Sequence, residues 1–88
     1  MLSQGYNQAM RVMQIGRGLT MKEALGMTHK ELSTINLLLD GKTQKEIAYL
    51  EQVSEAAISD RIKRIMIRNG YKTKTELLID CEKLRRLS

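Results

Sequence analysis

The chain has 88 residues, a length that suits one small domain and is too short for two. Its net charge is +5, its hydrophobic fraction of 42% is ordinary for a globular protein, and no apolar run approaches the roughly 20 residues of a membrane span. The first residues lack the basic and long apolar segments of a secretion signal. We therefore expect a cytoplasmic protein with no membrane partner.

The sequence has too few cysteines and histidines for an internal disulfide or a zinc site. One cysteine, Cys81, and one histidine, His29, cannot form an internal disulfide or supply the three or four ligands of a zinc site. The sequence also lacks a phosphate-binding glycine loop, a nucleophile with a histidine base, and paired acids in a predicted cleft. We expect neither an enzyme nor a protein with a cofactor.

The charge distribution favours a polyanionic partner. Residues 27–53 have a net charge of about −1, whereas residues 1–26, 54–70 and 71–88 each carry about +2. No helix combines a wide apolar face with a lysine-rich one, so nucleic acid is favoured over a membrane surface. Charge that only keeps the protein soluble is the alternative.

The first segment, residues 1–26, is the least regular. Tyr6, Met10 and Met13 have helical spacing, and residues 19–25 partly repeat the start of the next segment, either by chance or as a further capped turn. We expect an N-terminal arm, in part helical, that packs on the domain, on a second subunit or on a regulatory protein. A largely disordered tail is the alternative.

The rest of the chain predicts an all-α fold. It has no Pro, Phe or Trp, and its β-branched residues have helical spacing. Capping boxes, in which a threonine and a glutamate three residues later bond to each other's backbone N–H, occur at Thr28/Glu31, Thr43/Glu46 and Thr73/Glu76. Gly41 and Gly70 follow helical patterns as stop signals. The predicted helices span about 29–40, 44–51, 55–69 (N-cap Ser54) and 74–87.

Apolar residues at helical spacing form the predicted core of these helices. They are Leu32, Ile35, Leu38 and Leu39 in the first helix, Ile47, Ala48 and Leu50 in the second, Ile58, Ile62 and Ile65 in the third, and Leu77, Leu78, Cys81 and Leu84 in the fourth. Cys81 is expected as a small core residue, with redox sensing the weaker alternative. The short second helix, the tight turn and the longer, basic third helix are typical of a helix-turn-helix.

From Met27 to about Leu77, "MTHKELSTINLLLDGKTQKEIAYLEQVSEAAISDRIKRIMIRNGYKTKTEL" resembles the LuxR/GerE-type DNA-binding domain. The run "GKTQKEIA" is its most specific part. The matching positions are Thr28, Glu31, Gly41, Lys45, Glu46, Ile47, Ala48, Ser54 and Ile65. The resemblance implies a four-helix helix-turn-helix domain at 27–88, with the third helix in the major groove and a dimer formed through the fourth.

The sequence departs from the LuxR/GerE pattern on both helices of the predicted helix-turn-helix. Glu51 stands where leucine is usual, which suggests a rotated or shifted end of the second helix. Asn69 replaces a usually buried leucine. Ala57, Ser59 and Arg61 replace threonine, lysine and histidine.

The resemblance places Ser59, Asp60 and Lys63 at positions that usually contact bases. Asp60 could accept from the N4 amine of cytosine while Lys63 donates to guanine; a surface ion pair with Lys63 or Arg64, or a protein contact, are the alternatives for Asp60. The predicted phosphate contacts are Thr43, Lys45, Arg61, Arg64 and Arg68. On the fourth helix, which has more apolar residues than one core face needs, Leu78, Ile79 and Glu82 are the predicted homodimer interface.

These patterns predict a sequence-specific transcriptional regulator that binds double-stranded DNA as a dimer. The alternative is a helix-turn-helix module that binds a protein and controls another regulator or RNA polymerase, as an anti-activator or co-regulator. Glu51, Glu55, Asp60 and the apolar Ile67 on or near the expected DNA face support that alternative.

Overall fold

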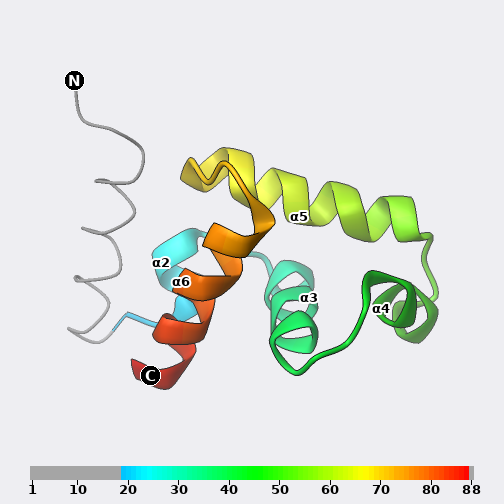
Figure 1. Cartoon of the computed structure of the whole chain (residues 1–88), viewed down its shortest axis with the longest axis horizontal. Coiled ribbons are helices and arrows are strands. Elements are labelled where there is room, and N and C mark those ends of the chain that lie inside the picture. Colours follow the sequence, from blue (N-terminus) through cyan, green and yellow to red (C-terminus); the bar gives the residue numbers. More distant parts are fainter. Residues whose placement is uncertain (1–18, 88) are drawn as a thin grey trace.

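The computed structural model describes residues 19–87, and these residues form five helices connected by short turns (Figure 1). The helices are α2 (Met21–Leu25), α3 (His29–Leu39), α4 (Gln44–Glu51), α5 (Glu55–Asn69) and α6 (Lys74–Leu87). The expected all-α class is confirmed for this part of the chain. The four predicted helices each begin and end within one residue of the predicted positions. No helix among residues 19–87 has both the length and the apolar character needed to cross a bilayer.

Local capping interactions set the helix starts. At α3, the Glu31 backbone N–H donates to Thr28 Oγ1 over 3.1 Å, and the Thr28 N–H donates to Glu31 Oε1 over 3.0 Å. The same reciprocal pair occurs at Thr43 and Thr73, while Ser54 Oγ accepts from the first turn of α5. Because each pair lies within four consecutive residues, the sequence alone could predict it.

Helix α2 lies in the segment expected to be an N-terminal arm. Thr20 and Glu23 form a further capping box, and Met21 and Leu25 are buried in the core. Residues 20–25 therefore belong to the domain, which corresponds to the capped turn that the sequence repeat suggested. The predicted helical segment with Tyr6, Met10 and Met13 lies outside the described residues.

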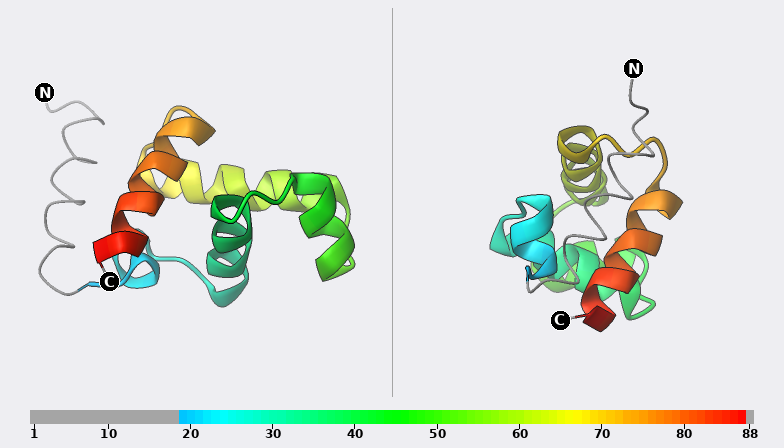
Figure 2. Two further views of the ribbon diagram at one scale, coloured as in Figure 1. Left: turned by 60° about the horizontal axis from the view of Figure 1, so that its bottom comes forward. Right: turned by 90° about the vertical axis from the view of Figure 1, so that its left-hand side faces the viewer.

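Helix α5 is the central element of the arrangement. It packs on α3, α4 and α6, with α4 near its first residues and α6 near its last, as two further views show (Figure 2). Its Ile58, Ile62 and Ile65 are buried, as predicted. The other predicted core residues are buried or, for Leu32, Leu38, Leu39 and Leu78, partly buried against the core. The exception is Leu50, which is 56% exposed, whereas Glu51 takes the inward position at the end of α4.

Candidate nucleic-acid interface

The turn between α4 and α5 is tight and well defined. Gln52 caps α4 in the left-handed conformation, with φ 58° and ψ 43°. The Val53 N–H donates to the Ala48 carbonyl over 3.0 Å, and Ser54 then caps α5. The result is a short helix, a turn and a longer helix held in contact.

The outward side of α5 carries two of the three residues predicted to contact bases. Asp60 and Lys63 are exposed, Arg64 lies beside them, and Ser59 is half-buried at the edge of this face. None of the ion pairs among the described residues involves Asp60. The surface ion pair considered for Asp60 is therefore not formed in this structure, and its carboxylate points to solvent.

Arg61 corrects one predicted phosphate contact. Its side chain is buried, and Nη1 donates to Glu51 Oε1 over 2.6 Å and to Thr34 Oγ1 over 2.9 Å. A guanidinium held this way between α3, α4 and α5 is not available to DNA. The prediction failed because it used the charge of Arg61 alone, without knowing that Glu51 would lie within reach.

Glu51 and Arg61, two residues at which the sequence differs from the pattern it resembles, contact each other. Glu51 is the last residue of α4, which ends where the sequence predicts, and its side chain is half-buried. Glu51 Oε2 is buried without a hydrogen-bond partner in the described structure.

Arg68 is also used inside the domain. Its two Nη atoms donate to the two carboxylate oxygens of Glu31, each over 2.9 Å, and Nη1 donates to the Gly26 carbonyl over 2.8 Å. The Arg68 hydrogen bonds, with help from the Thr28 N–H, hold the pKa of the Glu31 carboxyl below its usual value. In turn, Glu31 raises the pKa of Arg68. We therefore place Arg68 with the structural contacts and outside the proposed phosphate set.

The buried Asn69 has a structural role that its leucine counterpart could not fill. Its Nδ2 donates to the Leu25 carbonyl at the end of α2 over 2.9 Å and to the Ile65 carbonyl over 3.0 Å. This bond ties α2 to α5. The asparagine therefore satisfies a carbonyl at the end of the short helix α2.

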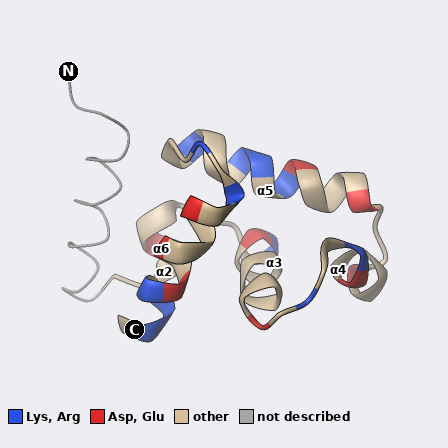
Figure 3. Ribbon diagram, viewed as in Figure 1, with Lys and Arg blue, Asp and Glu red and all other residues tan. Residues whose placement is uncertain are grey.

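The exposed charge on α5 is balanced. With Arg61 and Arg68 engaged, the exposed basic residues are Lys63 and Arg64, and Glu55 and Asp60 are the exposed acids. Figure 3 shows the acidic positions in the half of α5 next to α4 and basic positions in its middle. Any anionic partner would therefore meet positive charge in the middle of α5 and repulsion near its start.

The start of α4 provides further basic charge. Lys42, Thr43 and Lys45 are exposed. Thr43 Oγ1 accepts the Glu46 N–H over 3.1 Å, which leaves its hydroxyl proton able to donate. Lys42 is not among the predicted phosphate contacts; its position one residue before the α4 N-cap was the signal that could have found it.

The predicted dimer residues lie together on α6. Leu78 is half-buried, Ile79 is half-exposed, and both line a hollow of about 340 Å³ with Glu82 and with Leu39 of α3. Glu82 faces Arg85 at 3.4 Å. Cys81 on the inner side is buried, and burial followed by the charge of Asp80 raises the pKa of its thiol to about 12, which disfavours the redox alternative.

Comparisons of this chain with protein-family models, with curated protein sequences and with solved structures give no match.

Proposed function

We propose that this protein is a sequence-specific DNA-binding regulator that places α5 in the major groove. The observation that carries the proposal is the arrangement of α4, its tight turn and α5, which leaves one side of α5 exposed with Lys63 and Arg64 on it. A helix of this kind fits the width of the major groove. The resemblance to the LuxR/GerE pattern supports the same conclusion.

Base contacts are assigned to Lys63 and Asp60. Lys63 would donate to O6 and N7 of guanine, and the unpaired Asp60 carboxylate would accept from the N4 amine of cytosine. Because Asp60 would repel phosphate if it were not satisfied by a base, the pair favours sites with guanine and cytosine at these positions. Ser59 would make at most a contact at the edge.

Phosphate contacts are assigned to Lys45, Thr43 and Arg64, with Lys42 added from the structure. These groups lie at the start of α4 and in the middle of α5. In helix-turn-helix proteins the first helix crosses the phosphate backbone while the second enters the groove. Such contacts position the protein and supply most of the salt dependence.

The hollow on α6 supports a homodimer. A half-exposed Ile79 beside Leu78 would be covered by the same residues of a second copy across a two-fold axis. Two copies would then bind half-sites about one turn of DNA apart.

A protein-binding module remains the second candidate function. The observation that favours it is the balanced charge of the exposed side of α5, together with Ile67, which is 80% exposed on the same helix. An exposed isoleucine contributes little next to phosphates but contributes to a protein interface. A module of this kind would control another regulator or RNA polymerase.

Fluorescence anisotropy against pools of random-sequence duplex tests the proposal. We expect affinity to fall steeply with salt, with a log–log slope of about −0.9 for each phosphate contact. Lys63→Ala should weaken the selected site by about 1–3 kcal/mol and relax the preference at one base pair, whereas Lys45→Ala should weaken all sequences alike. Lys30→Ala, an exposed lysine on α3, is the matched control.

A protein that is helical by circular dichroism and still binds no duplex at low salt would falsify the DNA proposal. In that case the protein-binding candidate gains support if Asp60→Lys, which makes the face of α5 more basic, also fails to bind DNA.

A further inference from the structure

The outer face of α4 exposes large apolar side chains that the proposed DNA contact does not use. Tyr49 is 84% exposed, Leu50 is 56% exposed, and Val53 follows in the turn as a further exposed residue. Single exposed apolar residues are ordinary, but neighbouring ones often mark a binding surface. Here two of them are consecutive and line the same hollow.

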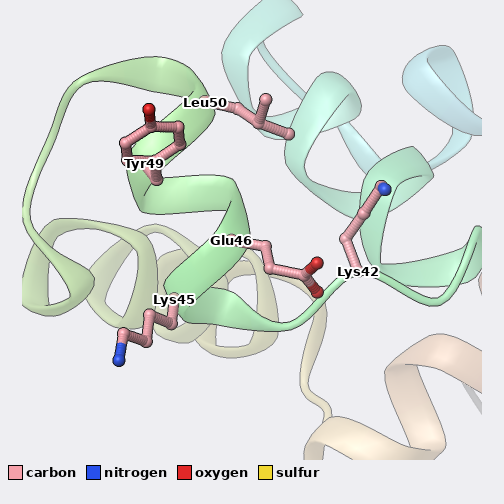
Figure 4. Close-up of a pocket in the computed structure, with 5 residues that line it drawn as sticks. All are labelled: Lys42, Lys45, Glu46, Tyr49 and Leu50. Atoms are coloured by element: carbon pink, nitrogen blue, oxygen red, sulfur yellow. The ribbon is translucent and has the colours of Figure 1, made fainter.

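This hollow has a volume of about 350 Å³ and is lined by Lys42, Lys45, Glu46, Tyr49 and Leu50. Figure 4 shows Tyr49 and Lys45 on one flank of α4 and Glu46 and Leu50 on the other. Lys42, from the loop before α4, lies on the same flank as Glu46 and Leu50. The volume is near the lower limit of small-molecule pockets, roughly 300 Å³. It suits one or two side chains inserted from a partner.

The charge around the hollow is positive. Lys42 and Lys45 take part in none of the ion pairs among the described residues. The only acid of the lining, Glu46, is engaged in the α4 capping box, where Oε1 accepts the Thr43 N–H over 2.8 Å. Lys45 lies on the flank of Tyr49 and Lys42 on the flank of Leu50. Their ammonium groups, which form no ion pair among the described residues, would complement carboxylates placed beside an apolar side chain of a partner.

We propose that this face of α4 binds an acidic protein segment that inserts a bulky apolar side chain between Tyr49 and Leu50 and places carboxylates near Lys42 and Lys45. Tyrosine is enriched at protein-binding hot spots because it offers a large rigid surface with a polar end. Leu50 and Val53 would gain nothing against the sugar-phosphate backbone, and Glu46 would repel it. A protein segment therefore fits the surface better than a nucleic acid does.

The docking site and the proposed DNA contact can be separated experimentally. Lys42 and Lys45 belong to both, whereas Tyr49 and Leu50 belong only to the docking site. Tyr49→Ala and Leu50→Ala should therefore leave duplex DNA binding unchanged. If the wild-type protein binds no duplex DNA, the proposed function is wrong, but the docking proposal is unaffected.

The test uses the full chain and a short fluorescent peptide composed of glutamate, leucine and phenylalanine, with the apolar residues at helical spacing. We expect saturable binding that Tyr49→Ala and Leu50→Ala each weaken by about tenfold. Lys42→Gln should weaken it by about threefold at low salt and less at high salt. Ile67→Ala removes an equally exposed apolar residue from α5 and should leave binding unchanged.

Two altered peptides complete the experiment. Replacing leucine and phenylalanine by serine should abolish binding, and replacing glutamate by glutamine should weaken it. The proposal is overturned if the wild-type protein shows no saturable binding, or if Ile67→Ala weakens binding as much as Tyr49→Ala does. It is also overturned if a single-stranded oligothymidylate binds more tightly than the peptide in a manner that depends on Tyr49. Circular dichroism of each variant confirms that it is folded.

Discussion

Helix α5 is fastened to its neighbours by two arginine–glutamate pairs that differ in completeness, one near its last residue and one in its middle. At the end next to α2, both Nη atoms of Arg68 are bonded to Glu31, and Glu31 Oε1 also accepts the Thr28 N–H. In the middle of α5, Arg61 Nη1 reaches only one oxygen of Glu51 at the end of α4, and the other oxygen is buried without a partner in the described structure. One attachment satisfies its buried polar atoms and the other does not.

This difference indicates where the domain is weakest. A buried acceptor without a hydrogen bond costs about 1–3 kcal/mol. The cost falls on the contact that holds α4 against α5. We therefore expect α4 to open more readily than α2 and α3, at the part of the molecule for which we propose DNA and protein contacts.

Removing each arginine alone should give the largest effects and rank the two attachments. Arg68→Ala leaves Glu31, with a side chain only 5% exposed, without its countercharge, and should lower the free energy of unfolding by about 3 kcal/mol. Arg61→Ala should cost about 2 kcal/mol, because Glu51 is 20% exposed and can recruit water. Urea unfolding measures both, with the exposed Arg86→Ala as the control. Equal losses would contradict the ranking.

Replacing both partners of a pair separates the two attachments further. Glu51→Leu with Arg61→Met removes the unsatisfied oxygen and should leave stability unchanged or raise it by about 1 kcal/mol. Glu31→Leu with Arg68→Met should remain destabilised by about 1–2 kcal/mol, because the Gly26 carbonyl and the Thr28 N–H lose their partners. The opposite order of the two double variants in urea unfolding would refute the comparison.

The turn after α4 offers a smaller effect. Gln52 is the one non-glycine residue with positive φ in the described chain. Glycine adopts this conformation without a Cβ penalty, so Gln52→Gly should stabilise the domain by about 0.5–1 kcal/mol. Thermal unfolding measures the gain, and Gln44→Gly, at the first residue of α4, is the control that should give no gain. No gain at Gln52 would mean that its side chain compensates for the strained backbone.

Of these effects, the pH dependence of stability that arises from Glu31 should be the smallest near neutral pH. The folded state holds the pKa of Glu31 below its usual value of 4.5, so the stability gained from the charged form is complete above that pH and is lost as the pH falls through the folded pKa. Glu31→Gln should be less stable at neutral pH and lose less on acidification. A parallel acid loss in wild type and variant would exclude Glu31 as a source of this dependence.

The helix bounds could be predicted from sequence because their causes are local. Each capping box is contained in four residues, and the left-handed stop after α5 depends on one glycine, Gly70. Helix α2 has the same signal at Thr20 and Glu23, but it lies in the part of the sequence for which we expect an N-terminal arm. Apolar spacing identified the core for the same reason, since helical geometry fixes which residues share a face.

The roles of the α5 arginines could not be predicted in this way. A helical wheel places Arg68 near the edge of the outward face and Arg61 on the apolar side between Ile58 and Ile65, but their charge alone suggests phosphate contacts. Whether such a long side chain turns inward depends on a carboxylate at Glu51 or Glu31, which only the folded arrangement brings near. The same holds for Asn69, whose acceptor lies on α2.

Chemical labelling of the buried Cys81 thiol can measure how often the domain opens. Alkylating reagents attack the thiolate, and with a pKa of about 12 and no exposure the folded form offers them almost none. Labelling of the unmodified chain therefore proceeds through opened molecules, and its rate measures how often the domain opens. A second cysteine placed at an exposed position would be labelled first, so dyes for distance measurements could be attached without removing Cys81.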